Sequence, residues 1–99
     1  MSEIRIIKKY PNRRLYDTAI SRYITLEDIR KLVISGVQFK VEDKRTRDDI
    51  TRGILLQVIA EREENGTPIF TNDLLQFIIR FYDDPMQTSI SRYLELSMK

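Results

Sequence analysis

The first quarter of the chain alternates between apolar and polar positions. Residues 4–10 follow a period of two and are rich in isoleucine, which predicts a β-strand. Pro11 and Asn12 end this pattern, because proline fixes φ and asparagine tolerates turn conformations. We therefore expect residues 13–17 to return as a second strand or an extended arm, and residues 22–25 to form a third short extended piece.

A helix is predicted over about residues 26–35. Thr25 and Asp28 resemble a capping box at its start, and Gly36 supplies its stop. The apolar residues between these signals recur at helical spacing: Leu26, Ile29, Leu32 and Val33.

A strand and the longest helix follow. Residues 37–42 alternate between apolar and polar, as in an antiparallel strand with one face in the core. The charged residues 43–48 are then a turn, and residues 49–64 form a helix. One apolar stripe runs along that helix: Ile50, Ile54, Leu55, Val58 and Ile59.

The last third of the chain is more apolar. Residues 72–82 leave only a narrow polar stripe, so a helix there must be covered almost all round, and another subunit can supply the cover. A final amphipathic helix is predicted from Met86 to Met98, with no stop signal before Lys99, as in a shortened chain or an unusually short protein. We expect contacts to a second copy or to an apolar polymer at Leu74, Phe77, Ile78, Phe81, Ile90 and Leu94.

These elements predict an α+β fold, with a small amino-terminal antiparallel β segment followed by helices. We expect one domain over residues 1–66 and a helical self-association region over residues 67–99. No apolar run approaches the roughly 20 residues that cross a bilayer, and the amino terminus lacks a secretion signal, so an intracellular location is expected.

Composition excludes much catalytic chemistry. The 99 residues include no cysteine and no histidine, which removes thiolate nucleophiles, Ser-His pairs, disulfides and the usual zinc sites. The paired acids at predicted helix ends are explained by solvation and by the helix dipole. We therefore expect neither enzymatic activity nor a cofactor.

Positive charge is concentrated at the start of the chain. The net charge is +2, yet residues 1–25 carry six basic and two acidic side chains, or +4. A polyanion responds to such a local field rather than to the total charge. The stretch "KKYPNRRLYDT", residues 8–18, alternates cations with aromatic rings, a composition suited to phosphates and base edges.

A structural interpretation of the same segment remains open beside this one. The apolar and aromatic residues can form the inner face of a small sheet: Ile6, Tyr10, Leu15, Tyr16, Tyr23 and Ile24. Asp17 can pair locally with Arg13 or Arg22. Bare charges are costly to bury, so the neighbouring lysines and arginines still point outward.

Four stretches resemble one protein family. "KKYPNRRLYDT", "SRYITLEDIRKLV", "DITRGILLQVIAERE" and "SRYLELSMK" are similar to the polyhydroxyalkanoate synthesis repressors, whose amino-terminal part is called the polyhydroxyalkanoate (or polyhydroxybutyrate) accumulation regulator DNA-binding domain. The resemblance implies a bacterial repressor that binds double-stranded DNA upstream of granule-associated genes, self-associates as a dimer or tetramer, and is released by nascent storage polyester. "DKRTRDDIT" departs from the usual "TGEDIT" stretch, because Arg47 stands in the place of glycine.

The resemblance places the DNA role on the first motif: Lys8, Lys9, Tyr10, Asn12, Arg13, Arg14 and Tyr16, with Arg22 as a flank. Chemistry ranks Arg13 and Arg14 for base or close phosphate contact, the two lysines for phosphate positioning, and Asn12 for turn geometry. Such a repressor would lie in the cytoplasm, at the nucleoid or at granules. A second hypothesis is a protein or granule-surface adaptor that uses its apolar carboxy-terminal helices.

Overall fold

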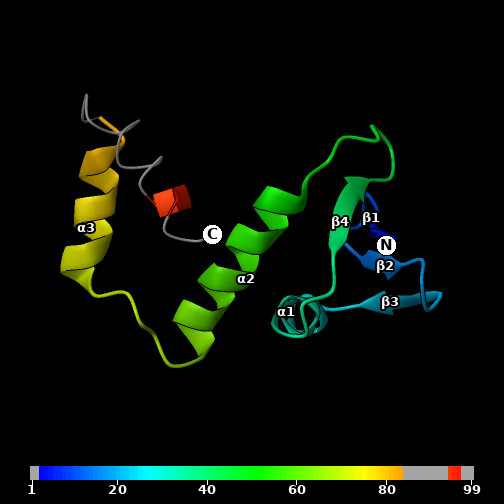
Figure 1. Cartoon of the computed structure of the whole chain (residues 1–99), viewed down its shortest axis with the longest axis horizontal. Coiled ribbons are helices and arrows are strands. Elements are labelled where there is room, and N and C mark those ends of the chain that lie inside the picture. Colours follow the sequence, from blue (N-terminus) through cyan, green and yellow to red (C-terminus); the bar gives the residue numbers. More distant parts are fainter. Residues whose placement is uncertain (1–2, 84–93, 97–99) are drawn as a thin grey trace. The chain divides into compact units, whose positions relative to one another are not determined.

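The computed structural model describes residues 3–83 and 94–96. The chain forms two compact units, Met1–Gly66 and Thr67–Lys99, which are described separately. The first unit combines a sheet with two helices, which confirms the predicted α+β class (Figure 1). Within the described residues, no helix is long and apolar enough to span a membrane.

The sheet has four strands in the order β3-β2-β1-β4. They are β1 (Arg5–Lys9), β2 (Leu15–Asp17), β3 (Arg22–Ile24) and β4 (Phe39–Asp43). The first three strands form an antiparallel meander, as predicted.

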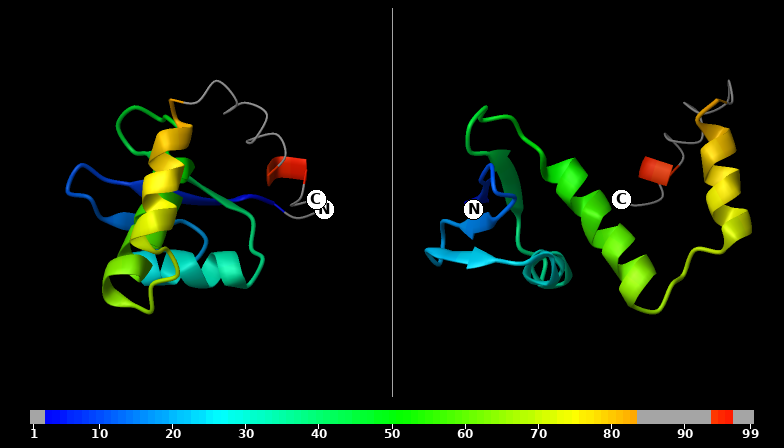
Figure 2. Two further views of the ribbon diagram at one scale, coloured as in Figure 1. Left: turned by 90° about the vertical axis from the view of Figure 1, so that its left-hand side faces the viewer. Right: turned by 180° about the vertical axis from the view of Figure 1, so that it is seen from behind.

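The antiparallel pairing expected for residues 37–42 is wrong, because β4 lies parallel to β1. Helix α1 (Leu26–Ile34) carries the chain back to the start of β1, so β4 runs in the same direction. The alternation that suggested an antiparallel strand has another cause. Within the first unit, α1 and α2 cover only one face of the sheet (Figure 2), so a parallel strand also needs only one apolar face.

Both helices of this unit begin near their predicted positions. Thr25 and Asp28 make the reciprocal hydrogen bonds of a capping box at α1, and Gly36 follows the helix with a φ of 75°. Helix α2 (Thr51–Asn65) begins directly after Ile50. Val33 and Ile59, which belong to the apolar stripes of these helices, are 49% and 48% exposed.

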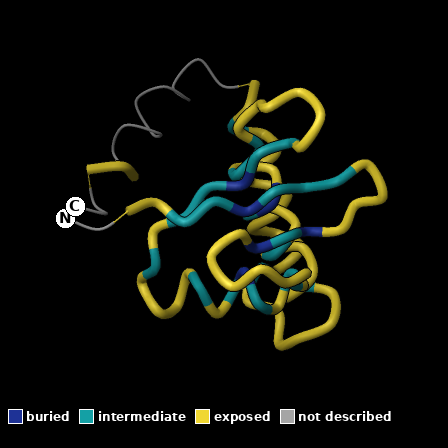
Figure 3. Tube along the Cα trace, turned by 90° about the vertical axis from the view of Figure 1, so that its right-hand side faces the viewer, coloured by how far each residue is buried: buried dark blue, intermediate teal, exposed yellow. Residues whose placement is uncertain are grey.

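The core lies between the sheet and the two helices (Figure 3). Its fully packed members are Ile7, Leu15 and Val41 from the sheet, Ile29 from α1 and Ile54 from α2. Ile7 lies opposite Val41 on one side and Asp17 on the other, so all three side chains share the covered face. Burial of each large apolar side chain contributes about 1.5–3 kcal/mol to the stability of the fold. The core therefore stabilises the strands from which the two loops described below extend.

The structural interpretation suggested that Asp17 pairs with Arg13 or Arg22. Asp17 is buried, but its partner is Arg5. Arg5 donates from Nε to both carboxylate oxygens of Asp17, at 3.1 and 3.0 Å, and also from Nη2. Arg5 is close enough because Asp17 pairs with Ile7, two residues along the same face of β1. This bidentate pairing satisfies the hydrogen-bonding capacity of the buried carboxylate. Asp17 is therefore not a partner of the cations in the hairpin loop.

In the second unit, helix α3 (Asn72–Phe81) is capped by Thr71, whose Oγ1 accepts from the Leu74 backbone N–H. None of its residues is buried, and Phe77 packs edge to face on Phe81 at 4.4 Å. Residues 94–96 are helical, and Leu94 is 57% exposed. Ile90 and most of the helix predicted from Met86 to Met98 lie outside the described residues.

Candidate nucleic-acid interface

The loop between β1 and β2 is a tight three-residue turn. Tyr10 closes it twice: its carbonyl accepts from the Arg13 N–H, and its N–H donates to the Arg14 carbonyl, both at 2.9 Å. Arg13 has a φ of 68°, in the left-handed region. This pattern is a type I turn followed by a left-handed residue, a position that glycine fills at the lowest cost.

Asn12 stabilises this hairpin loop, residues 11–13, from within. Its side-chain Oδ1 accepts a hydrogen bond of 3.1 Å from the Arg14 N–H. Asparagine commonly makes this bond to the backbone two residues on. This is the turn role expected of Asn12, and it fixes the backbone from which Arg13 and Arg14 project.

Three tyrosines lie on the face of the sheet opposite to α1 and α2. Tyr16 pairs with Tyr23 across β2 and β3, and the rings of Tyr10, Tyr16 and Tyr23 meet with centroids 5.2–6.3 Å apart. The predicted inner face therefore divides: Leu15 packs into the helix-covered core, whereas the tyrosines pack on each other on the opposite side. The strand registers decide this division, and the sequence alone does not contain them.

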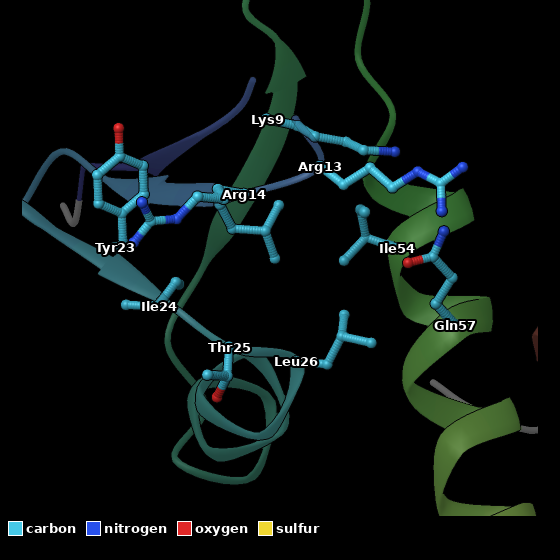
Figure 4. A pocket seen from close by; sticks show the side chains of 10 residues that line it. Lys9, Arg13, Arg14, Tyr23, Ile24, Thr25, Leu26, Ile54 and Gln57 are labelled. Atoms are coloured by element: carbon cyan, nitrogen blue, oxygen red, sulfur yellow. The ribbon is translucent and has the colours of Figure 1, made fainter. Parts of the chain in front are cut away.

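Arg14 is held by the tyrosine cluster. Its Cζ lies 3.9 Å from the centroid of the Tyr23 ring, a cation–π contact. The two neighbouring arginines of the hairpin therefore point in different directions. Figure 4 shows Arg14 over Tyr23 on one side and Arg13 extending toward α2 on the other.

Beside the loop lies an open hollow of about 800 Å³, between the hairpin and α2. Lys9 and Arg13 reach into it from the hairpin and Gln57 from α2 (Figure 4), above a floor that includes Leu15 and Ile54. Its rim thus combines cationic and amide groups, which can donate to phosphate oxygens or to base edges.

The structure brings together most, but not all, of the residues that the sequence singled out. Lys8 and Tyr16 are paired across β1 and β2 and share the open face with Tyr10, next to the loop. Lys9 borders the hollow. Arg22 is separate: it lies at the start of β3, beside Asp28 and Lys31 of α1, away from the hairpin loop.

The hairpin cations lie outside the ion pairs of the described residues, although Lys9 interacts electrostatically with Asp43, its register partner on β4. Within residues 3–83 and 94–96, the ion pairs join Arg5 to Asp17, Arg30 to Glu27, and Lys40 to Glu42. None of these pairs includes the four cations of the hairpin end: Lys8, Lys9, Arg13 and Arg14. No group of three acidic side chains in the described part of the chain is placed to hold a metal ion. The hairpin end is therefore suited to an anionic partner.

Sequence reasoning missed a second basic loop, residues 44–47. Because β4 is parallel to β1, this loop leaves the same end of the sheet as the hairpin loop, and the Lys44 N–H donates to the Lys9 carbonyl at 2.8 Å. Lys44, Arg45 and Arg47 are exposed there. The cations were visible in the sequence, but only the strand pairing places them beside the hairpin.

Comparison with known proteins adds two family matches. Residues 6–66 match the PHB/PHA accumulation regulator DNA-binding domain, and residues 70–99 match the PHB accumulation regulatory domain. PHB and PHA are polyhydroxybutyrate and polyhydroxyalkanoate. These matches confirm the resemblance carried by the sequence motifs.

Two relatives align with nearly the whole chain. An uncharacterized protein of Allochromatium vinosum is 56% identical over 98 residues, which cover 99% of this chain and 64% of the relative. A protein of Thiocystis violacea, described by its location in the phbA 5′ region, is 55% identical over 98 residues, covering 99% of this chain and 71% of the relative. No solved structure matches. The chain therefore belongs to the PHB/PHA accumulation regulator family, and its residues 6–66 are the family's DNA-binding domain.

Proposed function

We propose that this protein is a sequence-specific transcriptional repressor of storage-polyester synthesis, and that it contacts duplex DNA with the β1–β2 hairpin. The observation that carries the proposal is the hairpin end itself. It presents Lys8, Lys9, Arg13 and Arg14 around a tight loop, outside the ion pairs of the described residues. A two-stranded ribbon of this kind fits the major groove of B-DNA, which is about 12 Å wide.

Backbone strain supports the role of Arg13. A residue with a Cβ costs about 1–2 kcal/mol in the left-handed region, where glycine is nearly free of that cost. Arg13 is exposed at the tip and is not a member of the core cluster, so core packing does not account for its side chain. Strained residues of this kind concentrate at functional sites, and a side chain that contacts DNA explains why arginine occupies the position.

The two arginines have different parts in the proposal. Tyr23 restricts the guanidinium of Arg14 before DNA arrives, which lowers the entropy lost on binding, so Arg14 is the better candidate for a bidentate contact to guanine. Arg13 borders the hollow with Lys9 and Gln57, and we assign it to a phosphate or a base near the groove wall. Lys8 and Lys9 hold the ribbon in register through phosphates.

Regulation follows from the carboxy-terminal part. The PHB accumulation regulatory domain spans residues 70–99, and the exposed apolar side chains of α3 suit both a second copy of the chain and a hydrophobic polyester. A dimer or tetramer would present hairpins in pairs to a nearly palindromic site. Nascent polyester would then compete for α3 and release the DNA. The Thiocystis relative, located in the phbA 5′ region, is consistent with such a role near polyester genes.

A second candidate function is an adaptor at the granule surface. It is favoured by the same exposed apolar side chains of α3, among which Phe77 is 51% and Ile79 is 66% exposed. In that case the hairpin cations only keep the protein in solution. The two functions differ in the effect of hairpin substitutions: a DNA-binding repressor loses its affinity for DNA, whereas an adaptor does not depend on these cations.

The test is a DNA titration of the full chain and of the double variant Arg13→Ala, Arg14→Ala. The probe is a duplex that the full chain has enriched from a random-sequence library. The proposal expects specific binding to be lost in the double variant while the urea unfolding transition stays cooperative. Unchanged affinity in a folded double variant would leave the adaptor as the better account.

A further inference from the structure

The proposed function assigns DNA contacts to one loop, yet two loops leave the same end of the sheet. Lys9 and Asp43 are register partners on the parallel strands β1 and β4, and each strand runs directly into its loop. Neighbouring strands lie about 4.8 Å apart, so the loops start side by side. The left panel of Figure 2 shows the hairpin and the loop after β4 on the same side of the molecule.

We infer that residues 44–47 form a second DNA-contacting element, which binds backbone phosphates beside the groove that the hairpin enters. This inference rests on the proposed function, because it needs the hairpin to place the DNA. A ribbon inside a groove about 12 Å wide leaves the adjacent loop over the groove wall. The groove wall is the phosphate backbone.

The loop is built as a rigid platform. The Asp43 N–H donates to the Asp48 carbonyl at 2.9 Å and its carbonyl accepts from the Arg47 N–H at 2.8 Å, so the backbone closes on itself. The Asp43 carboxylate accepts from the N–H groups of Arg45 and Thr46, at 2.8 and 3.0 Å. A loop held by four such bonds presents its side chains without a large ordering cost.

The carboxylates of Asp43 and Asp49 are engaged in local hydrogen bonds, whereas Asp48 and the cations of the loop are exposed. Hydrogen bonds from the Thr46 and Arg45 backbone lower the pKa of Asp43, which keeps its carboxylate charged and bound to the loop. Asp49 accepts in the same way from the hydroxyl and N–H of Thr51, at 2.6 and 2.9 Å. The longer side chains of Lys44, Arg45 and Arg47 extend from exposed positions, and none belongs to an ion pair of the described residues.

Arg47 repeats the feature that marks Arg13. It is the last residue of its loop and has a φ of 68°. Glycine is the low-cost residue at such a position, so the arginine side chain carries a conformational cost that a DNA contact would account for. The competing interpretation is a solvated loop that merely tolerates arginine. The two differ in the number of counterions released when DNA binds.

The experiment measures the affinity of the full chain for its library-selected duplex between 50 and 200 mM salt. Each phosphate contact changes the slope of log affinity against log salt by about 0.9, or about 3.5-fold in affinity over this fourfold range. Arg47→Asn is expected to remove one such contact, and asparagine tolerates the left-handed backbone. The triple variant Lys44→Gln, Arg45→Gln, Arg47→Asn should lose up to three phosphate contacts. Its affinity should then fall about 40-fold less than that of the wild type between 50 and 200 mM salt.

Arg62→Asn is the matched control. Arg62 is also an exposed arginine among acidic neighbours, but it lies 11 residues along α2 from Thr51, about 17 Å along the helix axis. Its replacement should leave the slope unchanged. Arg47→Lys, which keeps the charge, should keep the wild-type slope as well.

Each result separates the inference from the function on which it rests. A reduced slope for the Arg47 and triple variants, with an unchanged slope for Arg62→Asn, supports the second element. A wild-type slope in the triple variant, while Arg13→Ala with Arg14→Ala abolishes binding, overturns the second element and leaves the hairpin intact. An equal reduction in Arg62→Asn also overturns it, because the effect would then be general charge. Failure of the wild-type chain to bind any duplex removes both.

Discussion

Arg13 and Arg47 occupy equivalent positions in two loops at the same end of the sheet. Each is the last residue of its loop, each has a φ of 68°, and each is exposed. The loops follow β1 and β4, which are parallel neighbours, and the Lys44 N–H donates a hydrogen bond to the Lys9 carbonyl. Two conformationally costly arginines are thus placed together, and both proposals about DNA depend on them.

The cost of these backbones can be measured directly. Arg13→Gly and Arg47→Gly should each raise the free energy of unfolding by about 0.5–1 kcal/mol, because the relief of the Cβ clash exceeds the extra backbone entropy that glycine loses. Gly36→Ala is the reverse control: φ is 75° and a Cβ there meets nothing within 4 Å, so only backbone strain is added. It should lower stability by about 1 kcal/mol. Urea unfolding measures all three, and destabilisation by Arg13→Gly would refute the strain argument.

Tyr23 is expected to act on DNA through Arg14. Tyr23→Leu should weaken operator binding about tenfold, because a cation–π contact of about 1 kcal/mol and the restriction of the guanidinium are both lost. Tyr23→Phe keeps the ring and should bind within about twofold of the wild type, since the contact uses the ring face. A titration of both variants decides the point. Equal losses in the two variants would mean that the hydroxyl, rather than the ring, matters.

The capping box of α1 should make part of the stability depend on pH. The hydrogen bond from the Thr25 backbone lowers the pKa of Asp28. A lowered folded-state pKa means that the stabilisation is complete above the ordinary pKa of about 3.9 and is lost as pH falls through the folded value.

Asp28→Asn tests this dependence. The variant should be less stable than wild type by about 0.5–1 kcal/mol at pH 7, as for the loss of a helix cap. The difference should vanish near pH 2, where the wild-type carboxyl is also neutral. Urea unfolding at several pH values measures it, and a gap that is constant with pH would contradict this role for the ionised carboxylate.

The exposed face of α3 is expected to mediate self-association. Phe77 is 51% exposed and packs on Phe81, so Phe77→Asp places a charge in the centre of the apolar surface. Sedimentation should show a lower mass for this variant than for wild type. Gln76→Asp adds the same charge on the polar stripe of the helix and should leave the mass unchanged. Wild-type protein that sediments as a monomer would rule out this contact.

The sequence predicted most elements, because local signals determine them. The turn at Pro11 and Asn12, the capping box at Thr25, and the stop at Gly36 all appear where their chemistry places them. These signals involve residues only a few positions apart. The α+β class follows from them.

Long-range pairing explains what the sequence did not reveal. Alternation in residues 37–42 identified a strand with one covered face, but it contains no information about the direction of the neighbour, and β4 proved parallel to β1. The partner of Asp17 depended on the same kind of register, which brought Arg5 rather than Arg22 to its carboxylate. The loop at residues 44–47 could not be joined to the hairpin until that pairing was known.

The central claim is that DNA contacts the loop end of the sheet. The most direct test is an NMR titration of the full chain with its selected duplex, following backbone amide signals. The largest shifts are expected at residues 8–16, at Tyr23 and at residues 44–47, with small changes at Lys31 in the last turn of α1. Shifts confined to α3, with the hairpin amides unchanged, would contradict the account.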